Sequence, residues 1–187
     1  MGQLCAAMAK YNGAKKVIIA DIQAERVSFA VSHKFADTSV LVPMKRFEKI
    51  EEKLAFAKEV AELVKAQNGG VDVDAVFECT GVESCLQAAI YATRPGGRIM
   101  LVGMGTPIQT LPISAAALRE IDLVGVFRYA STYEEAIKVV EKLPQLASLI
   151  TQTFKGFERI PEAFAMAGRV SDDKGDLVLK VVVDLSR

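Results

Sequence analysis

Tryptophan is absent from this sequence, histidine occurs once, and only three cysteines are present. Cys5, Cys79 and Cys85 are odd in number and show no C-x-x-C spacing, which argues against a disulfide framework and for a reducing compartment. The single histidine, His33, has no ligand set around it in the sequence, whereas zinc needs three or four convergent Cys, His or carboxylate ligands. We therefore expect no metal site within these residues.

A net charge is also absent, because 23 basic side chains balance 23 acidic ones. Without a basic block or an aromatic-spaced basic stripe, the sequence predicts neither a nucleic-acid partner nor a membrane-surface partner. No apolar run approaches the roughly 18 residues that a membrane-spanning helix needs. The first residues also lack the charged and apolar regions of a signal peptide. These absences predict a soluble, cytoplasmic protein whose partners are small molecules or other proteins.

Apolar residues make up 51% of the chain, enough for one core, and the length of 187 residues favours a single domain over residues 1–187. Short apolar runs typical of buried parallel strands alternate with helical patterns. The runs cover 17–20, 74–77, 99–102 and 123–126, and the helical patterns cover 47–64, 86–91 and 133–140. This alternation predicts an α/β fold with a mainly parallel sheet. Further on, we expect a short helix over 161–167, a turn at 172–175 and a strand over 177–183.

The first 21 residues have the order of a dinucleotide-binding unit. Gly2 precedes a helical pattern, a turn and a β-branched run that ends at Asp21, and in such units an acidic residue about twenty positions after the glycines holds the adenosine ribose. On this interpretation Gly2 is the third glycine of the fingerprint. We then expect a Rossmann-like, doubly wound parallel sheet that lacks its first, central strand. A helix that starts at residues 3–5 would still favour an anion. The alternative is that Asp21 only caps a helix starting at Ile22.

Three segments carry a resemblance to a known family. They are residues 77–81 (FECTG), 94–105 (RPGGRIMLVGMG) and 117–129 (ALREIDLVGVFRY). Together they resemble the zinc-containing medium-chain dehydrogenases, and the third is similar to the polyol branch of sorbitol and xylitol dehydrogenases. The resemblance covers Gly2 to about Leu185, which corresponds only to the family's C-terminal cofactor-binding domain. It implies NAD-dependent oxidation of a sugar alcohol to a ketose, with a catalytic zinc ion that polarises the alcohol.

The resemblance also implies roles for particular residues. Asp21 would bind the ribose hydroxyls and repel a 2′-phosphate, which favours NAD over NADP. Arg26 matches an adenosine-side arginine, although an exposed helix arginine is the alternative. Arg128 and Tyr129 match positions that reach the nicotinamide and the substrate hydroxyls. The candidate cofactor-binding residues are Gly2, Asp21, Arg26, Cys79, Thr80, Gly81, Val102, Gly103, Met104, Phe127 and Arg128, and the candidate substrate-binding residues are Arg128 and Tyr129.

The zinc ligands of the resembled family lie in a separate half that precedes this sequence. The resemblance therefore implies zinc in the full-length enzyme, no metal ligand and no catalytic residue in this chain, and an isolated chain without turnover. In polyol dehydrogenases an edge strand near Leu111 to Ile113 and the strand near 99–102 continue the sheet across dimers. The apolar side chains of Met104, Ile108, Leu111 and Ile113 accordingly predict a homo-oligomer.

Two other functions are compatible with the sequence. A truncated chain could persist as a non-catalytic relic that binds a nucleotide or acts by oligomerising. A methyltransferase that uses S-adenosylmethionine is the second alternative, because the Arg94-Pro95-Gly96-Gly97 turn and an acidic residue after a strand are also typical of that class. The segment over 117–129 favours the dehydrogenase over the methyltransferase.

Overall fold

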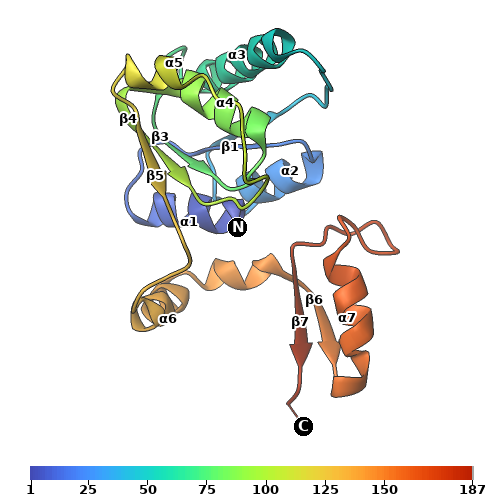
Figure 1. Cartoon of the computed structure of the whole chain (residues 1–187). Helices are drawn as coiled ribbons and strands as arrows, with labels where there is room; N and C mark the ends of the chain where they lie inside the picture. The colour runs from blue at the N-terminus through green and yellow to red at the C-terminus, as the bar shows by residue number, and fades with distance from the viewer. Residues whose placement is uncertain (187) are drawn as a thin grey trace. The chain divides into compact units, whose positions relative to one another are not determined.

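Helices and strands alternate along the first two thirds of the chain, as the apolar pattern predicts (Figure 1). The computed structural model describes residues 1–186 and divides them into two units, the first being Met1–Arg128 and the second beginning at Tyr129. The elements of the first unit are, in order, α1 (Gly2–Tyr11), β1 (Ile18–Asp21), α2 (Ala24–Ser32), β2 (Thr38–Leu41), α3 (Ile50–Gln67), β3 (Val73–Glu78), α4 (Glu83–Ala92), β4 (Thr93–Leu101), α5 (Ile113–Ala117) and β5 (Asp122–Gly125).

All strand pairs of the first unit are parallel. β1 pairs with β2 from Ile18 opposite Thr38 to Asp21 opposite Leu41, and β4 lies between β3 and β5. In Figure 1, α1 and α2 lie on one side of these strands, and α3, α4 and α5 lie on the other. Parallel strands covered on both faces are what continuous apolar runs favour. The predicted α/β, doubly wound class is confirmed.

The parallel sheet is interrupted between β1 and β3. These two strands belong to separate hydrogen-bonded sheets, and α1 lies against both of them. The first element of the described residues is α1, which begins at Gly2. Phe77, near the end of β3, remains 46% exposed, although aromatic side chains in a covered parallel strand are normally buried. β1 and β3 therefore each have one edge without a hydrogen-bonded neighbouring strand.

The core of the first unit lies between α4 and β4. Ile90 of α4 and Ile99 of β4 are both fully buried, and α5 adds the buried side chain of Ala116 to the same cluster. A second cluster joins Phe56 and Val60 of α3 to α4. Both clusters follow from helical faces with apolar residues at three- and four-residue spacing.

The second unit contains one short parallel strand pair with a helix beside it. Its elements are α6 (Tyr133–Lys142), the 3-10 helix η1 (Pro144–Leu149), β6 (Ile150–Lys155), the 3-10 helix η2 (Phe157–Arg159), α7 (Ile160–Ala167) and β7 (Lys180–Asp184). β6 and β7 pair in parallel, and α7 lies against β7. The helix expected over 161–167 is confirmed as α7. Among residues 1–186, no helix combines the length and the apolar character required to cross a membrane.

Some boundaries differ from the predictions. The strand expected over 177–183 begins only at Lys180, because Leu177 forms an isolated antiparallel bridge with Ser171 and the N–H of Val178 donates to the oxygen of Val170. The strand expected at 99–102 begins earlier, at Thr93, which pairs with Val73 across a register irregularity. The prediction of an edge strand near Leu111 to Ile113 is wrong. Pro112 has no N–H to donate to a sheet and instead precedes the first residue of α5.

Candidate functional site

The carboxyl ends of β1, β3 and β4 carry most of the candidate cofactor-binding residues. In open parallel α/β sheets, ligands bind at this edge. Asp21 is the last residue of β1, Glu78 is the last residue of β3, and Val102 follows the last residue of β4. The first residue of α1, Gly2, lies next to the end of β3, since a Cβ on Gly2 would lie 3.8 Å from the Cβ of Cys79. The structure thus brings Gly2, Cys79, Thr80, Gly81, Val102 and Gly103 to one edge.

Asp21 is half-buried at the end of β1, and its side chain shapes the entry into α2. Its Oδ1 accepts a hydrogen bond of 3.0 Å from the N–H of Gln23. Helix α2 begins at Ala24, so a helix start at Ile22 is two residues too early. Asp21 nevertheless stabilises the turn that leads into α2, as the capping alternative proposes. The same carboxylate, at the end of a strand, can also bind a ribose.

Arg26 lies in the first turn of α2 and connects this helix to α1. Its backbone oxygen accepts a 2.8 Å hydrogen bond from Nε2 of Gln3. The guanidinium Nε is buried and has no hydrogen-bond partner among residues 1–186. An unpaired buried donor costs about 1–3 kcal/mol, so a ligand oxygen at this position would remove an existing penalty. Arg26 is thus half-buried, with its Nε available to an acceptor.

Glu78 organises the loop after β3, although it was not among the predicted site residues. Its side chain is 6% exposed and accepts hydrogen bonds from Thr80 N at 2.8 Å and from Gly81 N at 2.9 Å. The hydroxyl of Thr80 also donates to it. The backbone oxygen of Glu78 accepts hydrogen bonds from the N–H groups of Val102 and Gly103. The signal in the sequence was an acidic residue at the end of a buried strand, followed by Thr and Gly at the positions that donate to it.

Glycine is required where the loop after β3 meets the loop after β4. Gly81 has a φ of +72°, which favours glycine, and a Cβ on Gly103 would collide with the backbone of Thr80 and Gly81. Gly105 is equally close to Gly81. Met104, in contrast, is 86% exposed. The two loops therefore touch through their backbones, with the Met104 side chain turned outwards.

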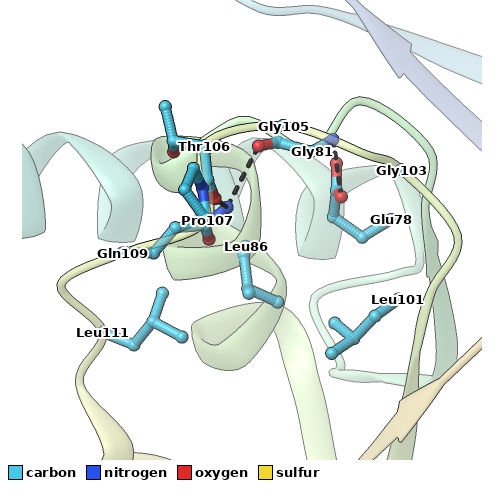
Figure 2. Close-up of a pocket in the computed structure, with 10 residues that line it drawn as sticks. All are labelled: Glu78, Gly81, Leu86, Leu101, Gly103, Gly105, Thr106, Pro107, Gln109 and Leu111. Atoms are coloured by element: carbon cyan, nitrogen blue, oxygen red, sulfur yellow. Dashed lines mark hydrogen bonds between the residues drawn. The ribbon is translucent and has the colours of Figure 1, made fainter.

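A hollow of about 320 Å³ lies beside these loops. Figure 2 shows Leu86, Leu101 and Leu111 on one side of it and the backbone of the glycine loops on the other. Nε2 of Gln109 donates a 3.0 Å hydrogen bond to the oxygen of Gly81, and Oε1 of Gln109 is buried without a partner among the described residues. The lining is mostly apolar with a few polar groups, as in many small-molecule sites. Gln109 was not predicted, because nothing in its sequence neighbourhood distinguishes it.

The remaining candidates lie after β5, where the two units meet in the sequence. Phe127 is 76% exposed, and the Arg128 guanidinium lies 5.1 Å from the centre of its ring. Arg128 has a φ of +55°, an uncommon backbone conformation for a residue other than glycine. Tyr129 begins the second unit, where its hydroxyl accepts a 2.9 Å hydrogen bond from Tyr133. Phe127 and Arg128 thus belong to the first unit, and Tyr129 belongs to the second.

Three cysteines lie near this edge, and two of them touch. Sγ of Cys79 donates a hydrogen bond to Sγ of Cys5 over 3.6 Å. This hydrogen bond lowers the pKa of Cys5 to about 7 despite its partial burial, with a further contribution from the positive N-terminus. The same contact and burial raise the pKa of Cys79. Desolvation of the thiol, with the charges of Glu78 and Asp21, raises the pKa of Cys85.

No cluster that could hold a metal ion exists among residues 1–186, in which no three His, Cys, Asp or Glu side chains converge. His33 stacks instead on the ring of Phe29, with 3.8 Å between the ring centres. The described residues therefore do not fit a zinc ion.

Comparison with known proteins agrees with the fold just described. The family described as "Zinc-binding dehydrogenase" matches residues 1–142, and the chain belongs to this family. The relatives confirm the resemblance to the polyol branch. The chain is 37% identical to the sorbitol dehydrogenase of Gallus gallus over 163 residues, which are 87% of this chain and 42% of that protein. It is 35% identical to the human enzyme over 165 residues, 88% of this chain and 43% of that one. The chain thus spans less than half the length of these relatives.

Solved structures show the same fold at lower identity. L-idonate 5-dehydrogenase from Escherichia coli superposes with a TM-score of 0.72 at 23% identity, covering 97% of this chain and 46% of that one. A zinc-binding dehydrogenase from Sinorhizobium meliloti bound to NADP gives a TM-score of 0.73 at 19% identity, covering 97% of this chain and 49% of that one. The methyltransferase alternative loses its support, because the family and these relatives are dehydrogenases.

Proposed function

We propose that residues 1–187 form the NAD-binding part of a dehydrogenase that oxidises a sugar alcohol to a ketose. Hydride would pass from the alcohol carbon to NAD, and the chain itself would supply binding and orientation rather than a catalytic residue. Asp21 carries the proposal, because it places a half-buried carboxylate at the carboxyl end of β1, beside the start of α2. The 37% identity to a sorbitol dehydrogenase supports the substrate class.

The adenosine half of NAD would lie against Asp21 and Arg26. The carboxylate of Asp21 would accept hydrogen bonds from the ribose hydroxyls and repel the 2′-phosphate of NADP. The buried Nε of Arg26, which has no partner among residues 1–186, supports a ligand oxygen nearby. The N–H groups at the start of α1, including that of Gly2, would face the pyrophosphate, since the first N–H groups of a helix have no intrahelical acceptor.

The nicotinamide half would lie along the loops that follow β3, β4 and β5. Thr80, Gly81, Val102 and Gly103 supply backbone at this edge, and Cys79 supplies a small side chain. The exposed side chains of Met104 and Phe127 are available to cover an apolar ring. Because the loops containing Gly81 and Gly103 already touch, a ring between them would require the loop after β4 to move.

Arg128 and Tyr129 would contact the sugar alcohol, and Arg128 would also face the cofactor. A guanidinium offers several fixed N–H donors and a phenol both donates and accepts, which suits a chain of hydroxyl groups. The family name implies zinc, but the described residues offer no ligand set for it. The zinc ion would belong to the full-length enzyme.

A function in oligomerisation with nucleotide binding alone is the second candidate. Ile108 is 87% exposed and Met104 is 86% exposed, and both lie in the segment between β4 and α5. Apolar side chains exposed together favour contact with another protein surface. We expect a homo-oligomer on this basis. The free cysteines favour the reducing environment of the cytoplasm.

Titration calorimetry of the 187-residue chain with NAD tests the proposal. Asp21→Ala removes charge-assisted hydrogen bonds worth about 1.5–3 kcal/mol, so NAD binding should weaken about ten- to a hundredfold. Asp122→Ala is the matched control, because Asp122 is an exposed carboxylate at the amino end of β5. Equal NAD affinity in the two variants, or equal affinity of the unaltered chain for NADP and NAD, would contradict the proposal.

A further inference from the structure

Cys5 and Cys79 form a pair whose thiol chemistry the proposed function does not use. Cys5 lies in the first turns of α1, Cys79 follows the last residue of β3, and the two are 74 positions apart in the chain. Their sulfur atoms are 3.6 Å apart, and both side chains are half-buried. A disulfide bond has a sulfur–sulfur distance of about 2.05 Å, so the two atoms need to approach by only about 1.6 Å.

The surroundings of the pair make Cys5 the more reactive sulfur. Its Sγ accepts the hydrogen bond that the Cys79 thiol donates, which favours the thiolate form of Cys5. The positive N-terminus acts in the same direction, so the pKa of Cys5 falls to about 7. Cys79 remains a thiol that can supply the second sulfur and a proton, because the contact with Cys5 and burial raise its pKa. A reactive thiolate next to a second thiol is the arrangement of redox-sensitive cysteine pairs.

We propose that Cys5 and Cys79 form a reversible disulfide when the protein meets hydrogen peroxide, joining α1 covalently to the end of β3. The Cys5 thiolate attacks one peroxide oxygen, which gives a sulfenic acid on Cys5 and releases hydroxide. The Cys79 sulfur then attacks the Cys5 sulfur and displaces the sulfenic oxygen, which leaves as water after taking up the Cys79 proton. The two sulfur atoms together lose two electrons and peroxide gains them, with one hydroxide ion and one water molecule as products.

The bond would join α1 to β3, which is one of the two strands beside the interruption of the sheet. α1 lies against both β1 and β3, which have no hydrogen bonds to each other. A link between residues 74 positions apart removes many conformations from the unfolded chain. The oxidised protein should therefore unfold roughly 5–15 °C higher than the reduced protein.

Mass spectrometry of the full chain after peroxide treatment at pH 7 tests the inference. The expected product is about 2 Da lighter, yields a peptide pair joined through Cys5 and Cys79, and returns to the starting mass with dithiothreitol. The reaction rate should rise as the pH passes about 7, the pKa of Cys5. Cys85, exposed and with a raised pKa, is the internal comparison and should remain unlinked.

Matched variants separate this pair from unspecific oxidation. Cys85→Ser should keep the loss of about 2 Da, whereas Cys5→Ser and Cys79→Ser should each abolish it. The same treatment in concentrated urea should remove the preference for Cys5 with Cys79, because the preference depends on the folded contact. Links to Cys85, oxygen addition to Cys5 without a link, or an equal yield in urea would overturn the inference. These three contradicting outcomes are all measured on the unaltered chain, so they do not depend on how the variants fold.

Discussion

The carboxylate of Glu78 accepts a 2.9 Å hydrogen bond from the N–H of Gly81, three residues further along the chain. With the hydrogen bonds from Thr80, this contact holds the loop after β3 in the shape seen in Figure 2, where Gly81 lies beside the loop after β4. The loop geometry of the proposed cofactor edge therefore depends on a buried side chain that makes all these contacts within its own turn.

Glu78→Ala should destabilise the first unit by about 2–4 kcal/mol, because it leaves two N–H groups and a hydroxyl without their acceptor. Urea unfolding measures the change in the free energy of unfolding. Glu78→Gln retains one acceptor oxygen, so its free energy of unfolding should lie between those of Glu78→Ala and the unaltered protein. Glu141→Ala, at an exposed position of α6, is the control and should change stability by less than about 0.5 kcal/mol. A Glu78→Ala variant as stable as the control would show that the loop does not need the carboxylate.

Gly103→Ala should destabilise the protein by at least about 2 kcal/mol, since its Cβ would collide with the backbone of Thr80 and Gly81. Gly125→Ala is a close control: Gly125 ends the neighbouring strand β5 and has no atom within 4 Å of an added Cβ. Thermal unfolding of the two variants side by side measures the difference. Equal unfolding midpoints would mean that the two loops are further apart in solution.

The sequence was sufficient for the features that depend on local pattern. The run ending at Asp21 predicted a parallel strand, because four adjacent apolar or β-branched residues suit a strand covered on both faces. The amphipathic pattern over 47–64 predicted α3, which begins at Ile50 and continues to Gln67. The apolar pattern after Gly2 predicted a helix before this strand, and α1 begins at Gly2 itself.

The features that the sequence did not predict depend on contacts between distant segments. Cys5 and Cys79 touch only because α1 lies against β3, 74 positions further along the chain. Gln109 reaches the oxygen of Gly81 from a loop 28 positions away. The resemblance predicted a strand near Leu111, but Pro112 favours the start of a helix there. Local helix propensity determines the structure of this segment, whereas tertiary contacts determine the positions of Cys5 against Cys79 and of Gln109 against Gly81.

The stability contributed by Asp37 should be lost in acid. Its carboxylate accepts hydrogen bonds from Lys10 Nζ at 2.7 Å and from Val17 N at 2.7 Å, and these contacts hold its pKa below the usual 3.8. A carboxylate with a lowered pKa in the folded state stabilises the protein above the unfolded value, and the contribution disappears as the pH falls through the folded value. Asp37→Asn should therefore be less stable than the unaltered protein at pH 7, and the two should converge towards pH 2.

Unfolding free energies measured from pH 7 down to pH 2 check this dependence. Lys10→Met and the double variant complete a cycle that isolates the contact between Lys10 and Asp37. A difference between the unaltered protein and Asp37→Asn that stays constant over the whole range would show that the carboxylate is not ionised in a stabilising contact.

The 187-residue chain should oxidise neither sorbitol nor xylitol with NAD, whether or not zinc is added. Hydride leaves an alcohol carbon readily only when the hydroxyl is deprotonated or nearly so, and a zinc ion achieves this in the resembled family by acting as a Lewis acid on the oxygen. Three protein ligands are the least that a catalytic zinc site uses, and residues 1–186 bring no such group together. NADH formation followed by absorbance, with an intact sorbitol dehydrogenase as the positive control, measures turnover, and metal analysis after dialysis measures bound zinc. NAD binding that depends on Asp21 without turnover is the expected combination, since the ribose contact needs no metal. Turnover similar to that of the control, or one tightly held zinc ion per chain, would contradict the assignment of this chain to cofactor binding alone.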